Sequence, residues 1–166
     1  MAKALFVKPL EIAEYTALNG NVDVDKFKQF MWIAQELDIQ NYLGTDLYNK
    51  IQAEIIAGTL ATPYLELVRD YIKPMCLNYS MVQYLPFAAY TIGNKGVYKH
   101  GSENSESVDK GELDSLIAKQ RSIAEHYSER FVKFMCFNSA TFPEYNSNSN
   151  GDMYPDKDVN YSSWFL

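Results

Sequence analysis

The sequence has too few histidines and cysteines for the common metal and redox sites. Its 166 residues include only two of each. A carboxylate-bridged metal pair in a helical bundle needs two Glu-x-x-His motifs, and neither His100 nor His126 has a glutamate three residues before it. Cys76 and Cys136 are 60 residues apart, and each lies within an apolar helical pattern. We therefore expect no cofactor, no metal and two reduced, packed thiols.

The chain also lacks the excess of basic residues that nucleic-acid-binding proteins carry. Lys and Arg number 15 against 21 Asp and Glu, a formal net charge of -6. Phosphate binding depends on clustered positive charge, so direct DNA binding is disfavoured. No apolar run is long enough to span a bilayer, and residues 4–7 are too short for the core of a signal peptide. The sequence predicts a soluble, unexported protein without membrane contact.

No catalytic motif is present. Gly93-Asn94-Lys95-Gly96 is the one candidate for a phosphate-binding loop, but a P-loop has four residues between its glycines and follows a strand. We interpret this segment as a helix end. No nucleophile, histidine and acid are arranged as in a catalytic triad, and no paired carboxylates stand in an apolar run. We expect that the protein is not an enzyme.

What the sequence does contain is a strong helical repeat of apolar residues between Thr62 and Gly96. Two adjacent apolar rows recur there at steps of three and four residues and together cover more than half of a helix surface. This pattern is typical of a helix packed on most sides, so we expect a long central helix over about residues 62–96. An interior proline removes a backbone hydrogen bond, so Pro74 and Pro86 predict a kink or break, near Pro86 in particular.

Other helices are predicted around this central one. One covers about residues 23–38, a second covers about residues 45–58, and a last long helix begins near Asp109. Residues 4–7 are a brief apolar run that we expect to pack in extended form on the domain or on a neighbour. The predicted fold is all-α, a helical bundle in a domain of residues 1–140.

The last part of the chain, residues 141–166, differs in character. It contains two prolines, an Asn/Ser run and no helical period, yet it keeps large apolar side chains that a plain disordered tail would lack. We interpret it as an extended C-terminal arm that docks on a protein partner. A frayed tail with incidental aromatic residues is the alternative. The arm's predicted interface anchors are Phe142, Tyr145, Tyr154, Tyr161, Trp164, Phe165 and Leu166.

Several motifs together resemble a known family. An N-terminal segment leads to Asp23-Val24-Asp25, and the later motifs are Ile39-Gln40-Asn41-Tyr42-Leu43-Gly44-Thr45-Asp46-Leu47-Tyr48, Tyr71-Ile72-Lys73-Pro74, Asn94-Lys95-Gly96-Val97 and Phe142-Pro143-Glu144-Tyr145. Over about residues 5–145 the chain is similar to the head-tail connector (adaptor) proteins of tailed bacteriophages, in particular those of crAss-like phages.

The resemblance implies a structural virion protein, made in the cytoplasm of the host bacterium and located at the head-tail junction. Such proteins form a ring, commonly of twelve copies, below the portal protein. The ring joins the capsid to the tail and lets DNA pass through its channel without sequence-specific binding. The implied partners are further copies of the chain, the portal, and other tail or connector proteins. The alternative function is a soluble bacterial helical interaction or regulatory module that binds one protein partner.

Overall fold

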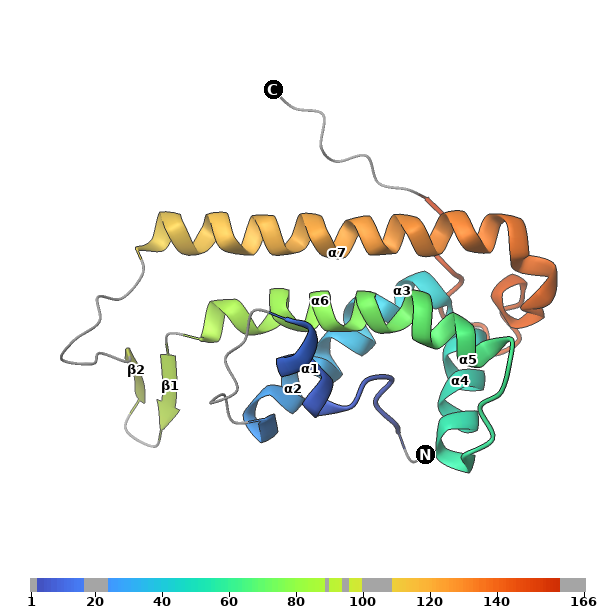
Figure 1. The fold of residues 1–166 in the computed structure, drawn as a ribbon, viewed down its shortest axis with the longest axis horizontal. Coiled ribbons are helices and arrows are strands. Elements are labelled where there is room, and N and C mark those ends of the chain that lie inside the picture. Colours follow the sequence, from blue (N-terminus) through green and yellow to red (C-terminus); the bar gives the residue numbers. More distant parts are fainter. Residues whose placement is uncertain (1–2, 17–23, 89, 94–95, 100–108, 159–166) are drawn as a thin grey trace, which may run out of the picture.

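A computed structural model of the protein describes residues 3–16, 24–88, 90–93, 96–99 and 109–158. Most of these residues are helical (Figure 1). The α-helices are α1 (Pro9–Tyr15), α2 (Val24–Ala34), α3 (Gln40–Leu43), α4 (Thr45–Ala57), α5 (Tyr64–Leu67), α6 (Lys73–Tyr84) and α7 (Lys110–Asn138). Two π-helical turns, η1 (Gln35–Ile39) and η2 (Val68–Ile72), join α2 to α3 and α5 to α6. Three 3-10 turns are η3 (Leu85–Phe87), η4 (Ser139–Thr141) and η5 (Pro143–Asn146). The prediction of an all-α fold is confirmed, with one small hairpin of β1 (Tyr90–Gly93) and β2 (Gly96–Lys99) added to it.

Helix α6 lies at the centre of the bundle, as its doubled apolar repeat predicted. It packs against both α2 and α7, and α7 runs alongside it in Figure 1. Packing on two sides explains why seven of its 12 residues are buried, where a surface helix would bury one narrower stripe. The buried residues are Met75, Cys76, Leu77, Tyr79, Ser80, Met81 and Val82.

Both prolines of the predicted central helix lie where the helical geometry changes. Pro74 is in the first turn of α6, directly after the π-helical turn η2. A π-helical turn is wider than an α-helical one, which gives room to a ring that would otherwise clash with the preceding turn. Pro86 lies in η3, which ends the helix at Phe87. The predicted break near Pro86 is confirmed, and the helix stops well before residue 96.

The predicted central helix extends to about residue 96, but Tyr90–Gly93 and Gly96–Lys99 are the two strands of the β1–β2 hairpin. Tyr90 pairs with Lys99 and Gly93 with Gly96 in an antiparallel register. The hairpin lies beyond the end of α6, away from the body of the bundle (Figure 1). Two short runs with β-branched and aromatic residues, separated by Gly-Asn-Lys-Gly, are a hairpin signal that the preceding helical repeat obscured.

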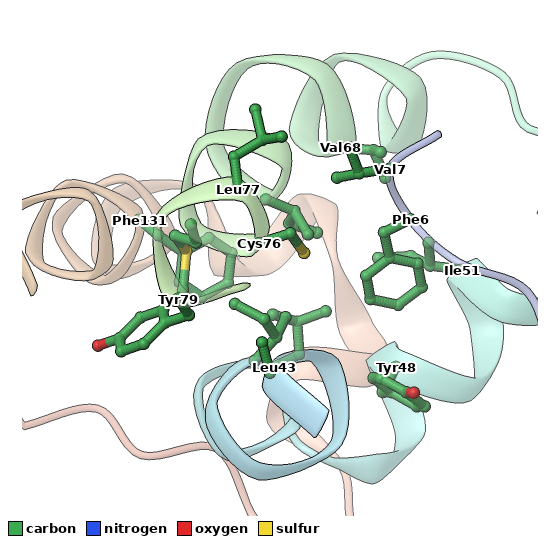
Figure 2. Close-up of a cluster of buried hydrophobic side chains, with 14 of the residues drawn as sticks. Phe6, Val7, Leu43, Tyr48, Ile51, Val68, Cys76, Leu77, Tyr79 and Phe131 are labelled. Carbon is green, nitrogen blue, oxygen red and sulfur yellow. The ribbon is translucent and has the colours of Figure 1, made fainter. Parts of the chain in front are cut away.

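The core joins the N-terminal segment to the helices. Figure 2 shows Phe6 and Val7 beside side chains of α4, η2 and α6. Phe6 and Val7 are buried, and the centroids of the Phe6 and Tyr48 rings are 5.2 Å apart. The N-terminal segment therefore packs on its own domain, which is one of the two predicted alternatives.

Two buried glutamines hold the backbone of this extended segment. The Phe6 N–H donates to Gln35 Oε1 at 2.8 Å, and Gln35 Nε2 donates to the Ala4 carbonyl at 3.0 Å. The Ala4 N–H donates to Gln52 Oε1 at 2.6 Å, and Gln52 Nε2 donates back to the Ala4 carbonyl at 2.7 Å. Both amides also donate to the Tyr48 hydroxyl. Buried backbone groups need partners, and here side chains take the place of a neighbouring strand.

Candidate protein-interaction surfaces

The described part of the predicted arm lies on its own domain. After α7, η4 and η5 reverse the chain, which then passes the start of α4 (Figure 1). Phe142 and Tyr145 are each 2% exposed and belong to the core, with their rings set edge-on to those of Tyr64 and Phe131. This corrects the prediction for these two residues. They anchor residues 141–158 on the chain's own domain and are not free to bind a neighbour.

The other predicted anchors differ from these two. Tyr154 is 52% exposed, and Met153 beside it is 39% exposed. Lys157 Nζ lies 4.9 Å from the centroids of both the Tyr154 and Tyr145 rings. Its ammonium group therefore makes cation–π contacts with the exposed Tyr154 and the buried Tyr145. Among the described anchors, Tyr154 therefore offers an aromatic side chain to solvent. Outside the described residues lie Tyr161, Trp164, Phe165 and Leu166.

An acidic side chain at the start of α4 fastens the Asn/Ser run. Asp46 accepts hydrogen bonds from Ser147 Oγ at 2.7 Å, from the Ser149 N–H and Oγ at 2.8 Å each, and from Asn150 Nδ2 at 3.3 Å. These donors, the Ser149 N–H foremost, hold the pKa of Asp46 below its ordinary value. The Asn/Ser run has the composition of a linker, but in the structure it supplies hydrogen-bond donors to the Asp46 carboxylate.

Thr45 extends this attachment by pairing with the next residues of the arm. The Thr45 N–H donates to the Met153 carbonyl at 3.0 Å, and the Met153 N–H donates to Thr45 Oγ1 at 3.2 Å. Thr45 Oγ1 donates to Asp152 Oδ2 at 2.9 Å. The Asp156 N–H then donates to the Asn41 carbonyl at 2.7 Å. We call these contacts of Asn41, Thr45 and Asp46 with residues 147–156 the clasp.

Gly44 allows the clasp to close. Its φ of 73° and ψ of 159° are open to glycine and unfavourable for other residues. A Cβ at this position would lie 2.5 Å from Pro155 Cδ, and Pro155 is buried against it. Gly44, which ends α3, therefore also leaves the space in which Pro155 of the arm packs.

Acid should weaken the clasp through Asp46. A carboxylate whose pKa is lowered in the folded state stabilises the fold above its ordinary pKa of about 3.9 and loses this contribution as the pH falls through the lowered value. Thermal unfolding measured between pH 7 and pH 2 tests this. The Tm of Asp46→Asn should be lower than that of the wild type at pH 7, and the two Tm values should converge as the pH falls. The control is Asp114→Asn, which removes an exposed carboxylate of α7 outside the clasp. A constant gap between Asp46→Asn and the wild type would contradict this assignment.

A second polar cluster ties η5 to α4 and α5. The Tyr64 hydroxyl donates to Glu144 Oε2 at 2.6 Å. Lys50 Nζ lies 3.0 Å from Glu54 Oε1 and 5.5 Å from the centroid of the Tyr64 ring. Burial, followed by the hydrogen bond to Glu144, raises the pKa of Tyr64, so this hydroxyl keeps its proton. The described residues include no group of three or more side chains placed to hold a metal ion.

An apolar groove of about 430 Å³ lies on α4, and we call it the α4 groove. Its charged and hydrogen-bonding groups are largely occupied within the chain. Lys3 pairs with Glu36, and the Gln52 amide bonds to Ala4 and Tyr48. Ile56 is 50% exposed at the groove. The groove is lined by Lys3, Tyr48, Asn49, Gln52, Ala53, Ile56 and Ala57.

Other large apolar side chains are exposed at separate places on the described surface. Phe137 near the end of α7 is 89% exposed, and Cys136 beside it is exposed as well. The prediction of a packed thiol is therefore confirmed for Cys76 and wrong for Cys136. Further exposed side chains are Leu10, Tyr15, Leu37, Ile56, Leu65, Phe87, Tyr90 and Leu116.

Comparisons with known proteins add one finding. Residues 39–154 match the profile of DUF6712, a family of unknown function. No curated protein and no solved structure matches the chain. The matched stretch begins in η1 and ends in the clasp, so it includes both Asp46 and the donors around it. In the part of the chain that the structure describes, every helix is too short or too polar to cross a membrane.

Proposed function

This chain belongs to the DUF6712 family, and we propose that it is a structural virion protein, a head-tail connector that forms a ring below the portal. The observation that carries the proposal is the clasp. It fixes the arm as far as Asp156, which gives the rest of the chain a defined starting point on the surface. The sequence after that point contains the aromatic residues Tyr161, Trp164 and Phe165. A fixed starting point makes a short segment a more effective binding element, because less freedom is lost on docking.

Two further features support an assembly role. Large apolar side chains are exposed at several separate places, and a ring requires two different contact patches on each subunit. The net charge of -6 suits a ring whose channel lets DNA phosphates slide past without binding them.

The proposal is tested with the full chain and the portal protein of the same phage. Negative-stain micrographs of the mixture should show rings of the connector on the portal, commonly with twelve copies, and mass photometry should give the copy number. A helical regulatory module, the alternative, would remain a monomer or dimer and bind one other protein. Absence of any complex between the chain and the portal would overturn the connector proposal.

A further inference from the structure

We infer that the α4 groove receives residues 159–166 of a second copy of this chain. The inference rests on the proposed function and deepens it, because it names the contact that would join neighbouring subunits.

The groove calls for an apolar occupant without charge. Its one lysine, Lys3, is paired with Glu36, and the Gln52 amide is engaged by Ala4 and Tyr48. What remains open is the methyl and methylene surface of Ala53, Ile56 and Ala57 together with the exposed side chain of Asn49, which is polar and uncharged. A volume of about 430 Å³ falls within the range of roughly 300–1,000 Å³ in which proteins bind compact apolar groups.

Residues 159–166 have the matching composition. The segment reads Val-Asn-Tyr-Ser-Ser-Trp-Phe-Leu and has no charged side chain. Its three aromatic rings can each bury about 150–250 Å² on docking. Trp and Tyr are also enriched at the centres of protein interfaces.

The clasp directs the chain away from its own groove. Met153 bonds to Thr45, Pro155 lies on Gly44, and Asp156 bonds to Asn41. From Met153 to Asp156 the arm therefore runs antiparallel to residues 41–45, from the start of α4 towards α3. The groove lies the other way, along α4 from Tyr48 to Ala57.

The length of the segment then favours a second copy. At 1.5 Å per helical residue, the middle of the groove near Gln52 lies about 12 Å along α4 from Gly44, and the chain from Pro155 to Asp158 spans at most about 10 Å. A return to the same groove thus covers about 12–22 Å after a reversal, which uses about four residues. Trp164 is six residues past Asp158, which leaves about two residues, or roughly 7 Å, for that return. A groove on a neighbouring molecule has no such constraint.

A donor segment at one place and a receiving groove at another make a heterologous contact. Such a contact repeats from subunit to subunit and closes into a ring when the rotation between them permits it. The same two elements therefore account for a ring without requiring a self-complementary patch.

The test uses two full-length variants that each lack one half of the contact. Ile56→Arg places a charge in the groove, and the double variant Trp164→Ser, Phe165→Ser removes the rings from the segment. Leu116→Arg is the matched control, because Leu116 is exposed on α7 outside the groove. Thermal unfolding should show both point variants folded, since Ile56 and Leu116 are about half exposed, and the same measurement establishes that the double variant is folded.

Sedimentation equilibrium measures the outcome. The wild type and the Leu116→Arg control should gain mass with concentration, while each half-variant should associate at least tenfold more weakly. An equimolar mixture of the two half-variants should form a 1:1 dimer and stop there, because one intact segment meets one intact groove. Half-variants that associate like the wild type, a mixture that stays monomeric, or a monomeric wild type would overturn the inference. Rings on the portal that form equally well from Ile56→Arg would overturn it too, and the connector proposal would stand. Failure of the wild type to bind the portal would overturn that proposal itself.

Discussion

Gly44→Ala should lower the free energy of unfolding by about 2–6 kcal/mol, combining a backbone strain of about 1–3 kcal/mol with an overpacking cost of about 1–3 kcal/mol. The strain arises because φ is 73° and ψ is 159°. The overpacking arises because the new Cβ would lie 2.5 Å from Pro155 Cδ and 3.0 Å from the Pro155 nitrogen. Urea denaturation measures the loss, and limited proteolysis within residues 147–156 should show that the arm has come off α4.

Gly58→Ala is the matched control for this prediction. Gly58 also has a positive φ, 68°, but no atom lies within 4 Å of the position that its Cβ would take. Its replacement should cost about 1–2 kcal/mol from backbone conformation alone, without release of the arm. Equal losses in the two variants, with the arm equally resistant to protease in both, would show that the contact between Gly44 and Pro155 contributes nothing.

Tyr145→Ala should destabilise the fold by about 3–5 kcal/mol, the usual cost of removing a large aromatic side chain from a core. Tyr145 is 2% exposed, and its ring lies edge-on to Phe131 at 5.9 Å between centroids. The variant should also free the arm, because η5 would lose its main apolar contact with α7. Chemical denaturation and the same proteolysis assay measure both effects.

Tyr145→Phe should behave in the opposite way. Within the described residues, the Tyr145 hydroxyl is buried and has no hydrogen-bond partner, and its burial raises the pKa of Tyr145. Leaving a polar group unsatisfied costs about 1–3 kcal/mol, so removing this oxygen should stabilise the fold by about 1 kcal/mol or more. A loss of stability in Tyr145→Phe would mean that the hydroxyl has a partner after all, such as an ordered water.

The helices could be predicted because their signals are local. The double apolar repeat of α6, the change from Gly44 to Thr45 between two helices and the Asp109 cap of α7 each lie within a few residues of the element that they define. Asp109 forms a capping box with Glu112, which fixes the start of the long helix. Such patterns depend on backbone geometry and on the periodicity of burial, and both are written in consecutive residues.

The arm could not be predicted in the same way, because its contacts are distant in sequence. Ser147 and Asp46 are 101 residues apart in the sequence. Their hydrogen bond depends on where the end of α7 lies relative to α4. An Asn/Ser run has the same composition whether its donors meet water or a carboxylate. The sequence predicts Phe142 and Tyr145 as anchors on a partner, because aromatic residues after a last helix have the same pattern whether they are buried on their own domain or on another. The glutamines that hold Ala4 carry no sequence signal that separates them from surface glutamines.

The contrast between the two cysteines gives the chain one site for chemical labelling. Burial raises the pKa of the Cys76 thiol and keeps reagents away from it, whereas Cys136 is open to solvent at the end of α7. A maleimide fluorophore should therefore attach once per chain to the native protein, without any substitution. Counting photobleaching steps in single labelled particles would then report directly how many subunits an assembly contains.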